Sequence, residues 1–558
     1  MTRTLLHIAG IAGLFVAIGA PDAQAQDWPA WGGGESRNMA SEATGLPDNF
    51  SAGDFKPGTD EVDLSSTENV KWVLKLGSQS YGNPTVANGR IYVGTNNDSP
   101  RDARFKGDRS NVYCFDEKTG DFIWQLSVPK LGTGKVSDWE YLGICCSPTI
   151  DGDRVYILTN RCEVMCLDVN GMADGNQGYQ DEGLYMAWPA KEPMEVMDTD
   201  ADILWVYNMI DELGVFPHNI TTSAVLVAGD NLWVTSSNGV DYGHVETPAP
   251  NAPSLIMMDK MTGKLLGEEA SGCSSRIFHS NWSSPAYLRT DETELCIFGG
   301  PDGWIYAFKP KPIGGADDES DEESDEEADE WPILDEAWRF DANLPEYRMK
   351  DGEPIKYTDR DGPSEVLATP IVHDGLIYAP IGQDPEHGPG VGNLVCLDAK
   401  GKQVWNYSKI NRSLSTLAVA YGLVFASDFS GFVYCLDAKT GEEYWIHDTK
   451  GHIWASPFVA DGKVYIGNED GFLTILAASK EAKPKPKPKK KGQKDKPAKP
   501  KAEVIEIDMV SPVYASVIAA NGVLYVGTHT HLYAVVKPKG DDASDDASDD
   551  SDSDTGGH

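Results

Sequence analysis

The segment that decides the fold is Asn83-Pro84-Thr85-Val86-Ala87-Asn88-Gly89-Arg90-Ile91-Tyr92-Val93, because it returns along the chain. A second copy is Ser147-Pro148-Thr149-Ile150-Asp151-Gly152-Asp153-Arg154-Val155-Tyr156-Ile157, and a third runs from Ser456 to Ile466. Further copies begin at Ser223, Ser284, Thr369, Thr416 and Ser516. Such self-similarity is typical of repeat folds and propellers.

Each copy predicts a β-hairpin. Two apolar runs, rich in β-branched and aromatic residues, flank Asn-Gly, Asp-Gly or a similar pair, and glycine tolerates the positive φ of tight hairpin turns. No stretch keeps a long 3.6-residue apolar period, so helices should be few. Eight hairpins therefore predict an all-β fold, an eight-bladed propeller over residues 69–538.

A second motif follows several hairpins. Asp116-Glu117-Lys118-Thr119-Gly120 leads to Trp124, and Asp437-Ala438-Lys439-Thr440-Gly441 leads to Trp445 at the same spacing. The Asp carboxylate can accept backbone N–H groups of the turn, and Gly takes its left-handed corner. The Trp then lies on the next strand, where its flat ring can pack against a neighbouring blade.

This D-x-x-T-G-x-x-x-W pattern resembles the tryptophan-docking motif of the pyrroloquinoline quinone (PQQ) repeat propellers. That family includes quinoprotein alcohol dehydrogenases and the propeller component of the outer-membrane protein assembly machine. The resemblance covers residues 69–536. It implies the fold, and because the motif is a packing device it implies no particular chemistry.

The two ends of the repeat region predict how the ring closes. The last hairpin is followed by one more strand, His531 to Val536, so its blade lacks an outermost strand. Near the start, Asn69 to Leu76 is a strand with no hairpin before it. We expect this N-terminal strand to complete the last blade, which removes exposed sheet edges.

Composition predicts location and partners. Residues 1–25 have the pattern of a signal peptide with cleavage near Ala25, so the mature chain is expected to be periplasmic or secreted. The apolar stretch Leu5 to Ala20 is too short for a good membrane span. A net charge of −40 argues against nucleic-acid binding. We expect a monomer whose partner is an envelope protein or polymer.

Several segments lie outside the repeats. Residues 26–68 form an N-terminal extension. An acidic insert at 316–330, a Lys/Pro insert at 480–501 and an acidic tail at 539–558 are expected to be disordered and solvated. Of the nine cysteines, four share one repeat position, ahead of an Asp, where we expect buried thiols. These four are Cys114, Cys166, Cys396 and Cys435.

The adjacent Cys145 and Cys146 leave two interpretations open. Quinoprotein dehydrogenases have a vicinal disulfide that packs on the quinone, and the resemblance then implies PQQ and Ca²⁺ as cofactors. Alternatively, the pair occupies an ordinary repeat position, because Cys145 aligns with residues that precede the first strand of other blades. The aligned residues are Tyr81, Trp282, Trp454 and Tyr514.

First strands of propellers line the central channel, so these aligned side chains should surround one of its mouths. Two polar loops enter neighbouring blades beside them, one with His218 and Asn219 and the other with Arg276, His279 and Asn281. An aromatic mouth could stack on a flat cofactor, bind a peptide or plug the channel. The candidate cofactor-binding residues are Cys145, Cys146, His218, Asn219, Arg276, His279, Asn281, Trp282, Trp454 and Tyr514.

Two loops rich in oxygen ligands are candidates for Ca²⁺. Asp198, Asp200 and Asp202 alternate as in an EF-hand loop, but the Gly and Glu that such a loop needs are replaced by Ile203 and Met209. The second loop contains Asp168, Asn170 and Asp174. Asx turns are the alternative interpretation of both loops.

Two functions remain open. One is a non-catalytic exported scaffold that presents its loops and channel mouth to a protein or polymer. The other is a PQQ- and Ca²⁺-dependent dehydrogenase acting on an alcohol or sugar. No Glu/Asn/Asp set suited to calcium and no catalytic base can be matched, so catalytic residues stay unassigned and the scaffold is favoured.

Overall fold

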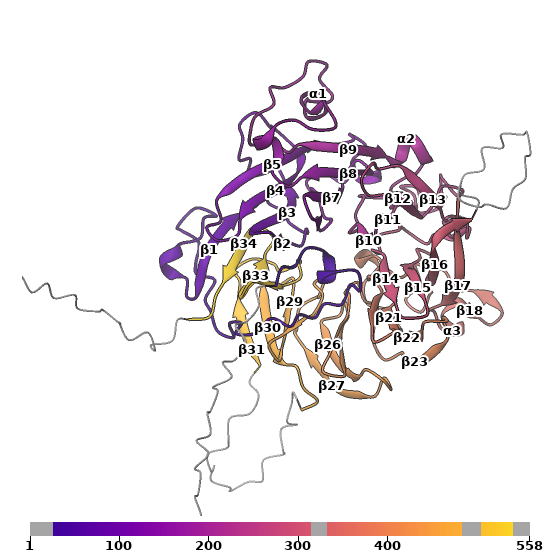
Figure 1. Ribbon diagram of the computed structural model, residues 1–558. Coiled ribbons are helices and arrows are strands. Elements are labelled where there is room, and N and C mark those ends of the chain that lie inside the picture. Colours follow the sequence, from indigo (N-terminus) through magenta and orange to yellow (C-terminus); the bar gives the residue numbers. More distant parts are fainter. Residues whose placement is uncertain (1–25, 314–331, 482–503, 539–558) are drawn as a thin grey trace, which may run out of the picture.

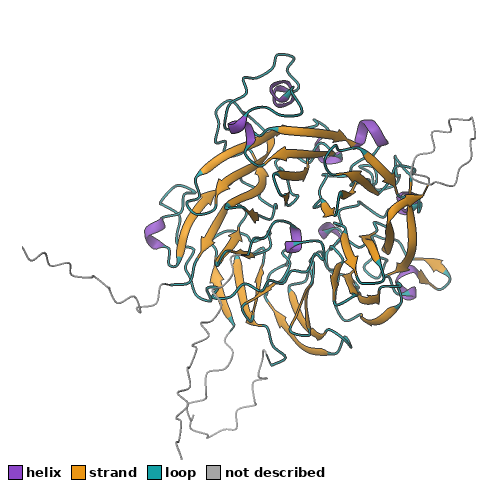
Figure 2. Ribbon diagram, in the orientation of Figure 1, coloured by secondary structure: helices purple, strands orange, loops and turns teal. Residues whose placement is uncertain are grey.

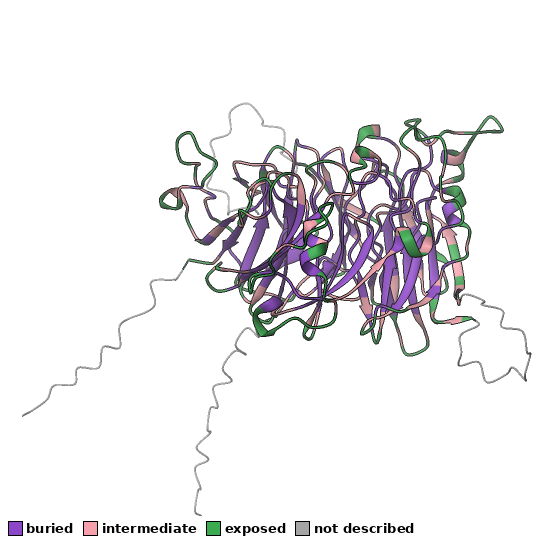
Figure 3. Cartoon of the chain, turned by 90° about the horizontal axis from the view of Figure 1, so that it is seen from above, coloured by how far each residue is buried: buried purple, intermediate pink, exposed green. Residues whose placement is uncertain are grey.

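The computed structural model describes residues 26–313, 332–481 and 504–538, and their strands form a ring around a central channel (Figure 1). The predicted signal peptide, the tail and nearly all of the two charged inserts lie outside these residues. Within the described ranges, no helix has the length and apolar character needed to cross a membrane. Viewed at right angles to the ring, most strand residues are buried, and the exposed residues lie mainly in loops and helical turns (Figure 3).

All eight predicted hairpins form, and each belongs to a unit of four antiparallel strands. Asn88 and Gly89 in the first turn have φ of 54° and 73°, as a tight hairpin turn requires. The first four units are β2 (Thr85–Ala87), β3 (Arg90–Asn96), β4 (Arg109–Asp116) and β5 (Phe122–Pro129); β6 (Thr149–Asp151), β7 (Arg154–Leu158), β8 (Glu163–Asp168) and β9 (Ile203–Asn208); β10 (Leu226–Ala228), β11 (Asn231–Thr235), β12 (Leu255–Asp259) and β13 (Leu265–Glu268); and β14 (Ala286–Arg289), β15 (Glu294–Gly299), β16 (Trp304–Ile313) and β17 (Ile333–Asp341).

The remaining units complete the ring. They are β20 (Ile371–His373), β21 (Leu376–Pro380), β22 (Leu394–Asp398) and β23 (Gln403–Tyr407); β24 (Ala418–Ala420), β25 (Leu423–Ser427), β26 (Phe432–Asp437) and β27 (Glu443–Asp448); β28 (Phe458–Ala460), β29 (Lys463–Gly467), β30 (Phe472–Ala477) and β31 (Ile505–Asp508); and β32 (Ile518–Ala520), β33 (Val523–Gly527) and β34 (His531–Val535) with β1 (Val70–Lys75). The N-terminal β1 pairs antiparallel with β34, the pairing that the sequence predicts.

Helical turns occur in the loops between strands (Figure 2). They are α1 (Glu182–Ala187), α2 (Met209–Leu213), α3 (Pro345–Arg348) and the 3-10 turns η1 (Trp31–Gly33), η2 (Leu64–Ser66), η3 (Gly134–Val136), η4 (Gly171–Asp174), η5 (Cys273–Arg276) and η6 (Pro385–His387). A separate two-stranded ribbon consists of β18 (Met349–Lys350) and β19 (Glu353–Pro354).

The tryptophans of the repeat motif join consecutive units. Trp405 in β23 donates from Nε1 to the carbonyl oxygen of Ala438 in the next unit at 3.1 Å, and its ring lies against Gly441. The same hydrogen bond runs from Trp72, Trp124, Trp338 and Trp445 to the carbonyls of Glu117, Val169, Ala399 and Ser479. Four of these tryptophans therefore dock on the Asp-to-Gly turn of the following repeat, and Trp445 docks on the corresponding segment at Ser479.

A second set of contacts joins the units around the channel. Each repeat opens with Ser, Thr or Asn, and in four of the repeats the side-chain oxygen of this residue accepts the backbone N–H of the opening residue one unit earlier. The amide of Thr369 donates to Thr416 (3.1 Å), Thr416 to Ser456 (2.9 Å), Ser456 to Ser516 (2.8 Å) and Ser516 to Asn83 (2.5 Å). The last contact joins the C-terminal unit to the N-terminal unit.

Residues 26–50, here called the strap, cross the middle of the ring (indigo in Figure 1). Arg37 is completely buried and donates to the carbonyls of Trp31, Pro285, Ala224 and Val225. The strap also hydrogen-bonds to every four-stranded unit, through Val86, Ile150, Val225, Tyr287, Val372, Val419, Val459 and Asn521. The extension that the sequence leaves unassigned is therefore part of the folded body.

The predicted thiols are confirmed as buried. Cys114, Cys166, Cys396 and Cys435 are buried, and all nine cysteines are free.

The tryptophan docking makes Gly441→Ala a destabilising change. Gly441 has φ of +72°, and a Cβ atom there would lie 2.7 Å from the Trp405 ring. We expect unfolding in urea to show a loss of about 2–4 kcal/mol, because strain of the left-handed backbone adds to displacement of the ring. The control Gly462→Ala has a similar φ of +69° with open space around it, and should cost only about 1 kcal/mol. Equal losses in the two variants would show that the ring contact contributes nothing.

The strap predicts a strong effect of Arg37→Met. This change removes the donors from four buried carbonyls, so we expect thermal unfolding to show a loss of roughly 3 kcal/mol or more. Arg289→Met is the matched control, since Arg289 binds Glu35 of the same strap but is 45% exposed, and should cost less than about 1 kcal/mol. If Arg37→Met were as stable as the control, the hydrogen bonds of Arg37 would contribute nothing to the stability of the fold.

Candidate binding site at the channel mouth

A cavity of about 350 Å³ lies at the channel end where the first strands of the units begin. We call it the mouth cavity. Four aromatic side chains line it, together with the carboxylates of Asp384 and Glu386, and the lining residues include no Lys or Arg within the described ranges. The aromatic side chains are those of Tyr81, Trp139, Trp282 and Trp454.

The aromatic rings are held by polar contacts at their edges. Trp282 donates from Nε1 to the carbonyl of Ile220, and Trp454 donates to Glu469, both at 3.0 Å. Tyr514 packs on Tyr81 with ring centroids 5.1 Å apart and meets Trp454 edge-on. The structure thus brings together the aromatic residues that the repeat alignment predicts at one mouth.

A smaller chamber of about 150 Å³ lies deeper in the channel. Trp31 of the strap lines it and donates from Nε1 to Thr369 at 3.0 Å. Cys145 lines both the chamber and the mouth cavity, whereas Cys146 lines only the chamber and its sulfur accepts from the Leu158 amide. Burial raises the pKa of both thiols to about 12, so both stay protonated and unreactive near neutral pH.

One edge of the mouth cavity is formed by η6. Asp384 precedes this turn and accepts the Glu386 amide at 2.8 Å. Asp384 is only 8% exposed, and burial raises the pKa of its carboxyl group to about 6. Its Oδ2 lies 3.9 Å from Nδ1 of His279. The acidic edge therefore adjoins a group of histidines.

His218, His244 and His279 form this group, here called the histidine cluster. Nε2 of His218 lies 3.1 Å from Nε2 of His279 and 3.1 Å from Nε2 of His244. His218 and His279 are buried and His244 is exposed. The cluster borders the mouth cavity, since Asn219 follows His218 into its lining and the Trp282 ring lies 5.2 Å from the His279 ring.

Backbone hydrogen bonds fix the two buried histidines on one segment, residues 237–240. The His218 amide donates to Ser237, and the Val240 amide donates to the carbonyl of His279 at 3.0 Å. A Cβ at Gly239 would lie 2.4 Å from the Cβ of His218, so only glycine allows this approach. Burial lowers the pKa of His218 to about 4 and that of His279 well below its usual value.

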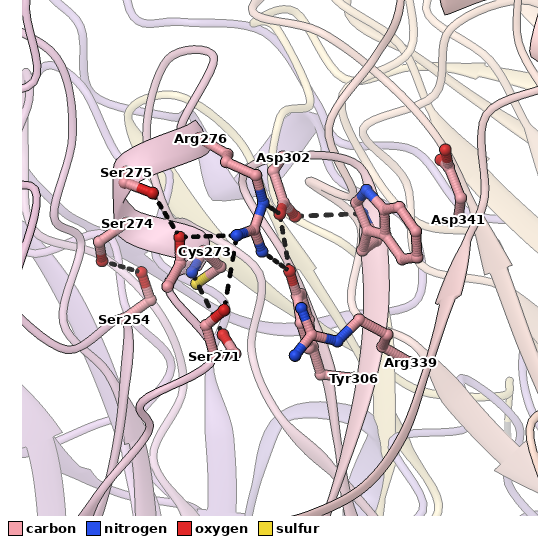
Figure 4. Close-up of polar contacts among 12 residues, drawn as sticks. Ser254, Ser271, Cys273, Ser274, Ser275, Arg276, Asp302, Tyr306, Arg339 and Asp341 are labelled. Atoms are coloured by element: carbon pink, nitrogen blue, oxygen red, sulfur yellow. Dashed lines mark hydrogen bonds and ion pairs between the residues drawn. The ribbon is translucent and has the colours of Figure 1, made fainter.

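Arg276 and Asn281, also predicted at the mouth, make their hydrogen bonds with residues outside the lining of the mouth cavity. Arg276 ends η5, where it donates to Asp302 at 3.0 Å and to the Tyr306 hydroxyl at 2.7 Å (Figure 4). Tyr306 in turn donates to Asp302 at 2.6 Å. Asn281 is buried and donates to the carbonyl of Ser254. These partners hold the two loops in place, while Oδ1 of Asn281 has no hydrogen-bond partner among the described residues.

The predicted calcium ligands fall into different environments. Asp200 is fully buried and pairs with Arg104 through both oxygens, so a protein cation occupies its carboxylate. Asp202 accepts the Gln177 amide, while Asp198 is exposed. In the other loop, Asp168 accepts the Asn170 amide and Asp174 accepts from the Asn170 side chain, as in an Asx turn.

Sequence reasoning missed His244, Trp139 and Asp384. Each stands in a loop outside the repeat pattern, and the chain distances to their partners are long. His244 is 26 residues from His218 and Asp384 lies more than a hundred residues from His279. The one local signal is Asp241, whose carboxylate accepts the Val245 and Glu246 amides and shapes the turn that carries His244.

Comparisons with known proteins match the repeats. Residues 390–483 match the family model described as outer membrane protein assembly factor BamB. Quinohemoprotein alcohol dehydrogenase ADH IIB of Pseudomonas putida is 32% identical over 129 residues, 20% of this chain and 18% of that protein. The 1-butanol dehydrogenase (cytochrome c) of Thauera butanivorans is 32% identical over 130 residues, 20% of this chain and 17% of that protein. The chain thus spans less than a fifth of the length of these relatives.

Solved structures of similar shape are more distant in sequence. BamB from Moraxella catarrhalis aligns over 84% of this chain and 97% of its own, with 14% identity and a TM-score of 0.48. Quinohemoprotein alcohol dehydrogenase from Comamonas testosteroni aligns over 92% of this chain and 81% of its own, with 12% identity and a TM-score of 0.42. The four-stranded units and docked tryptophans thus form a β-propeller, and residues 390–483 of it are similar to the repeats of that family model.

Proposed function

We propose that this propeller is a non-catalytic scaffold of the cell envelope that binds a basic segment of a protein partner at its mouth cavity. The observation that carries the proposal is the lining of that cavity, four aromatic rings with Asp384 and Glu386 and no basic side chain among the described lining residues. Aromatic faces and carboxylates together favour a cation on an apolar stem, as in Lys or Arg.

The charge of the chain supports the same partner. A net charge of −40 attracts basic segments and speeds their approach. The rings are fixed by their own hydrogen bonds, so little ordering is needed when a ligand enters. Location in the envelope is part of the proposal, supported by the signal-peptide pattern of residues 1–25 and by the match to an outer membrane protein assembly factor model.

A quinoprotein dehydrogenase is the alternative, and the residues at the mouth do not fit its cofactor. PQQ carries three carboxylates, which require cationic partners, whereas the described lining supplies two carboxylates and no Lys or Arg. Arg276, the cation predicted near the quinone, is bound to Asp302 and Tyr306. Cys145 and Cys146 are free thiols, so no disulfide offers a surface to a quinone. We therefore derive no step through PQQ.

Selection of random peptides displayed on phage tests the proposal. We expect the mature chain to enrich peptides with Lys or Arg, because their side chains fit the mouth cavity. In calorimetry, Trp282→Ala and Glu386→Gln should each weaken the best peptide by about 10-fold or more. Trp188→Ala is the matched control, since Trp188 is 40% exposed and does not line the cavity, and should bind like wild type.

Two kinds of result would reject the proposal. Enrichment of acidic or purely apolar peptides, or equal affinity in Trp282→Ala and wild type, would reject the basic-segment proposal. Saturable, Ca²⁺-dependent binding of PQQ together with dye reduction on an alcohol or sugar would establish the dehydrogenase instead.

A further inference from the structure

The histidine cluster contains three imidazole nitrogens that point at one place. The Nε2 atoms of His244 and His279 each approach Nε2 of His218, and the ligand nitrogens of all three lie within 4.8 Å of one another. The three rings are mutually edge-on, with interplanar angles of 63°, 75° and 87°. They therefore converge through their edges and are not stacked on one another.

The three histidines cannot satisfy all of their close contacts with hydrogen bonds to one another. Nδ1 of His218 lies 2.7 Å from the carbonyl of Val240, and because a carbonyl only accepts, Nδ1 carries the proton. Nε2 of a neutral His218 then offers one lone pair, which one N–H group can use. Two Nε2 atoms lie 3.1 Å from it, so one of the two approaches remains without a hydrogen bond.

The surroundings of His279 lead to the same arrangement of protons. Among the described residues Nδ1 of His279 has no hydrogen-bond partner, and Oδ2 of Asp384 lies 3.9 Å from it. A proton on Nδ1 faces this carboxylate favourably, and Nε2 then presents its lone pair to His218. In metal sites, a ligating histidine commonly directs its second N–H at a carboxylate or a backbone carbonyl. His218 has such a carbonyl partner in Val240, and Nδ1 of His279 faces the Asp384 carboxylate at 3.9 Å, beyond hydrogen-bond distance.

We propose that His218, His244 and His279 bind one divalent first-row transition-metal ion, such as Zn²⁺ or Cu²⁺, through their Nε2 atoms. Imidazole nitrogen is the ligand that these ions prefer. Nitrogens bound at ~2.0–2.1 Å to one tetrahedral zinc ion lie about 3.3 Å apart, close to the 3.1 Å separations in the cluster. A cation at the shared point uses all three lone pairs at once.

Backbone contacts fix the two buried histidines in this arrangement in the metal-free chain. Segment 237–240 binds the backbones of both buried histidines, and Gly239 permits their close approach. His244 is exposed and stands on the turn shaped by Asp241, so it gives an ion a route from solvent. With three protein ligands, a tetrahedral ion keeps one position for water or another donor. The metal site does not depend on the proposed binding of a basic segment, although Asp384 adjoins both.

Metal titration of the tag-free, chelator-treated mature chain tests the site. We expect calorimetry with Zn²⁺, and separately with Cu²⁺, to give one ion per chain with a Kd at or below about 1 µM. His244→Ala should weaken binding by at least about 100-fold, since loss of a metal ligand costs more than loss of a residue that only orients a ligand. Because His244 is exposed, this variant should keep the thermal stability of the metal-free chain. Asp384→Asn, a change to a positioning residue, should weaken binding by about 10-fold.

His373→Ala is the matched control. His373 is half-buried on β20, near Asn38 of the strap, and should leave affinity and stoichiometry unchanged. Electron paramagnetic resonance of the Cu²⁺ form should show coupling to three imidazole nitrogens, falling to two in His244→Ala. Absence of binding at about 100 µM metal, or equal affinity in wild type, His244→Ala and His218→Gln, would overturn the proposal. Loss of peptide binding with metal binding intact would reject only the proposed function.

Discussion

The contact between a tryptophan and the glycine turn of the next repeat is the interaction on which the ring depends. One four-stranded unit cannot bury its apolar faces alone, and tryptophan docking joins most of the units to a neighbour. The third unit shows what replaces the contact when it is lost. Gly267 stands where the Trp would be, and there the outer strands β13 and β17 pair directly through Glu268 and Ile333. Backbone pairing thus joins the two sheets at the position where the tryptophan side chain is absent.

Inside the channel, the units are joined by a different chemistry. Channel-facing strands leave backbone N–H groups that would be unpaired when buried, and the opening Ser, Thr or Asn of the following unit accepts them. The strap supplies hydrogen-bond donors to backbone carbonyls of the repeats. Arg37 brings several donors to carbonyls of two units and to its own turn, and burial without a carboxylate partner lowers its pKa to about 9.

The mouth combines two sources of side chains. The repeat places an aromatic residue before a first strand, as at Tyr81, Trp282 and Trp454, and these become the walls of the mouth cavity. Loops outside the repeat supply the polar groups, as at His244 and Asp384. A rigid ring that carries variable loops is a common way to build a binding site, because the loops can change without loss of the core. The cavity and the histidine cluster share this edge and Asp384, which lines the cavity and faces His279.

Much of the fold follows from the sequence alone. The hairpins, the docking tryptophans and the pairing of β1 with β34 depend on contacts within one repeat or at a fixed repeat offset, so periodicity reveals them. The aromatic mouth follows in the same way, since Tyr81, Trp282 and Trp454 share a repeat position. By contrast, the strap has no repeat to align with, and Arg37 finds its partners across the ring. The partners of Arg276 and Asn281 do not follow from the repeat either, because polar loop residues take the nearest partner, here Asp302 and Ser254. The sequence by itself determined the ring and the aromatic side chains around its mouth. Only the tertiary structure decided which polar groups meet there, because His218, His244 and His279 lie on separate loops, and the folded ring sets the distances between them.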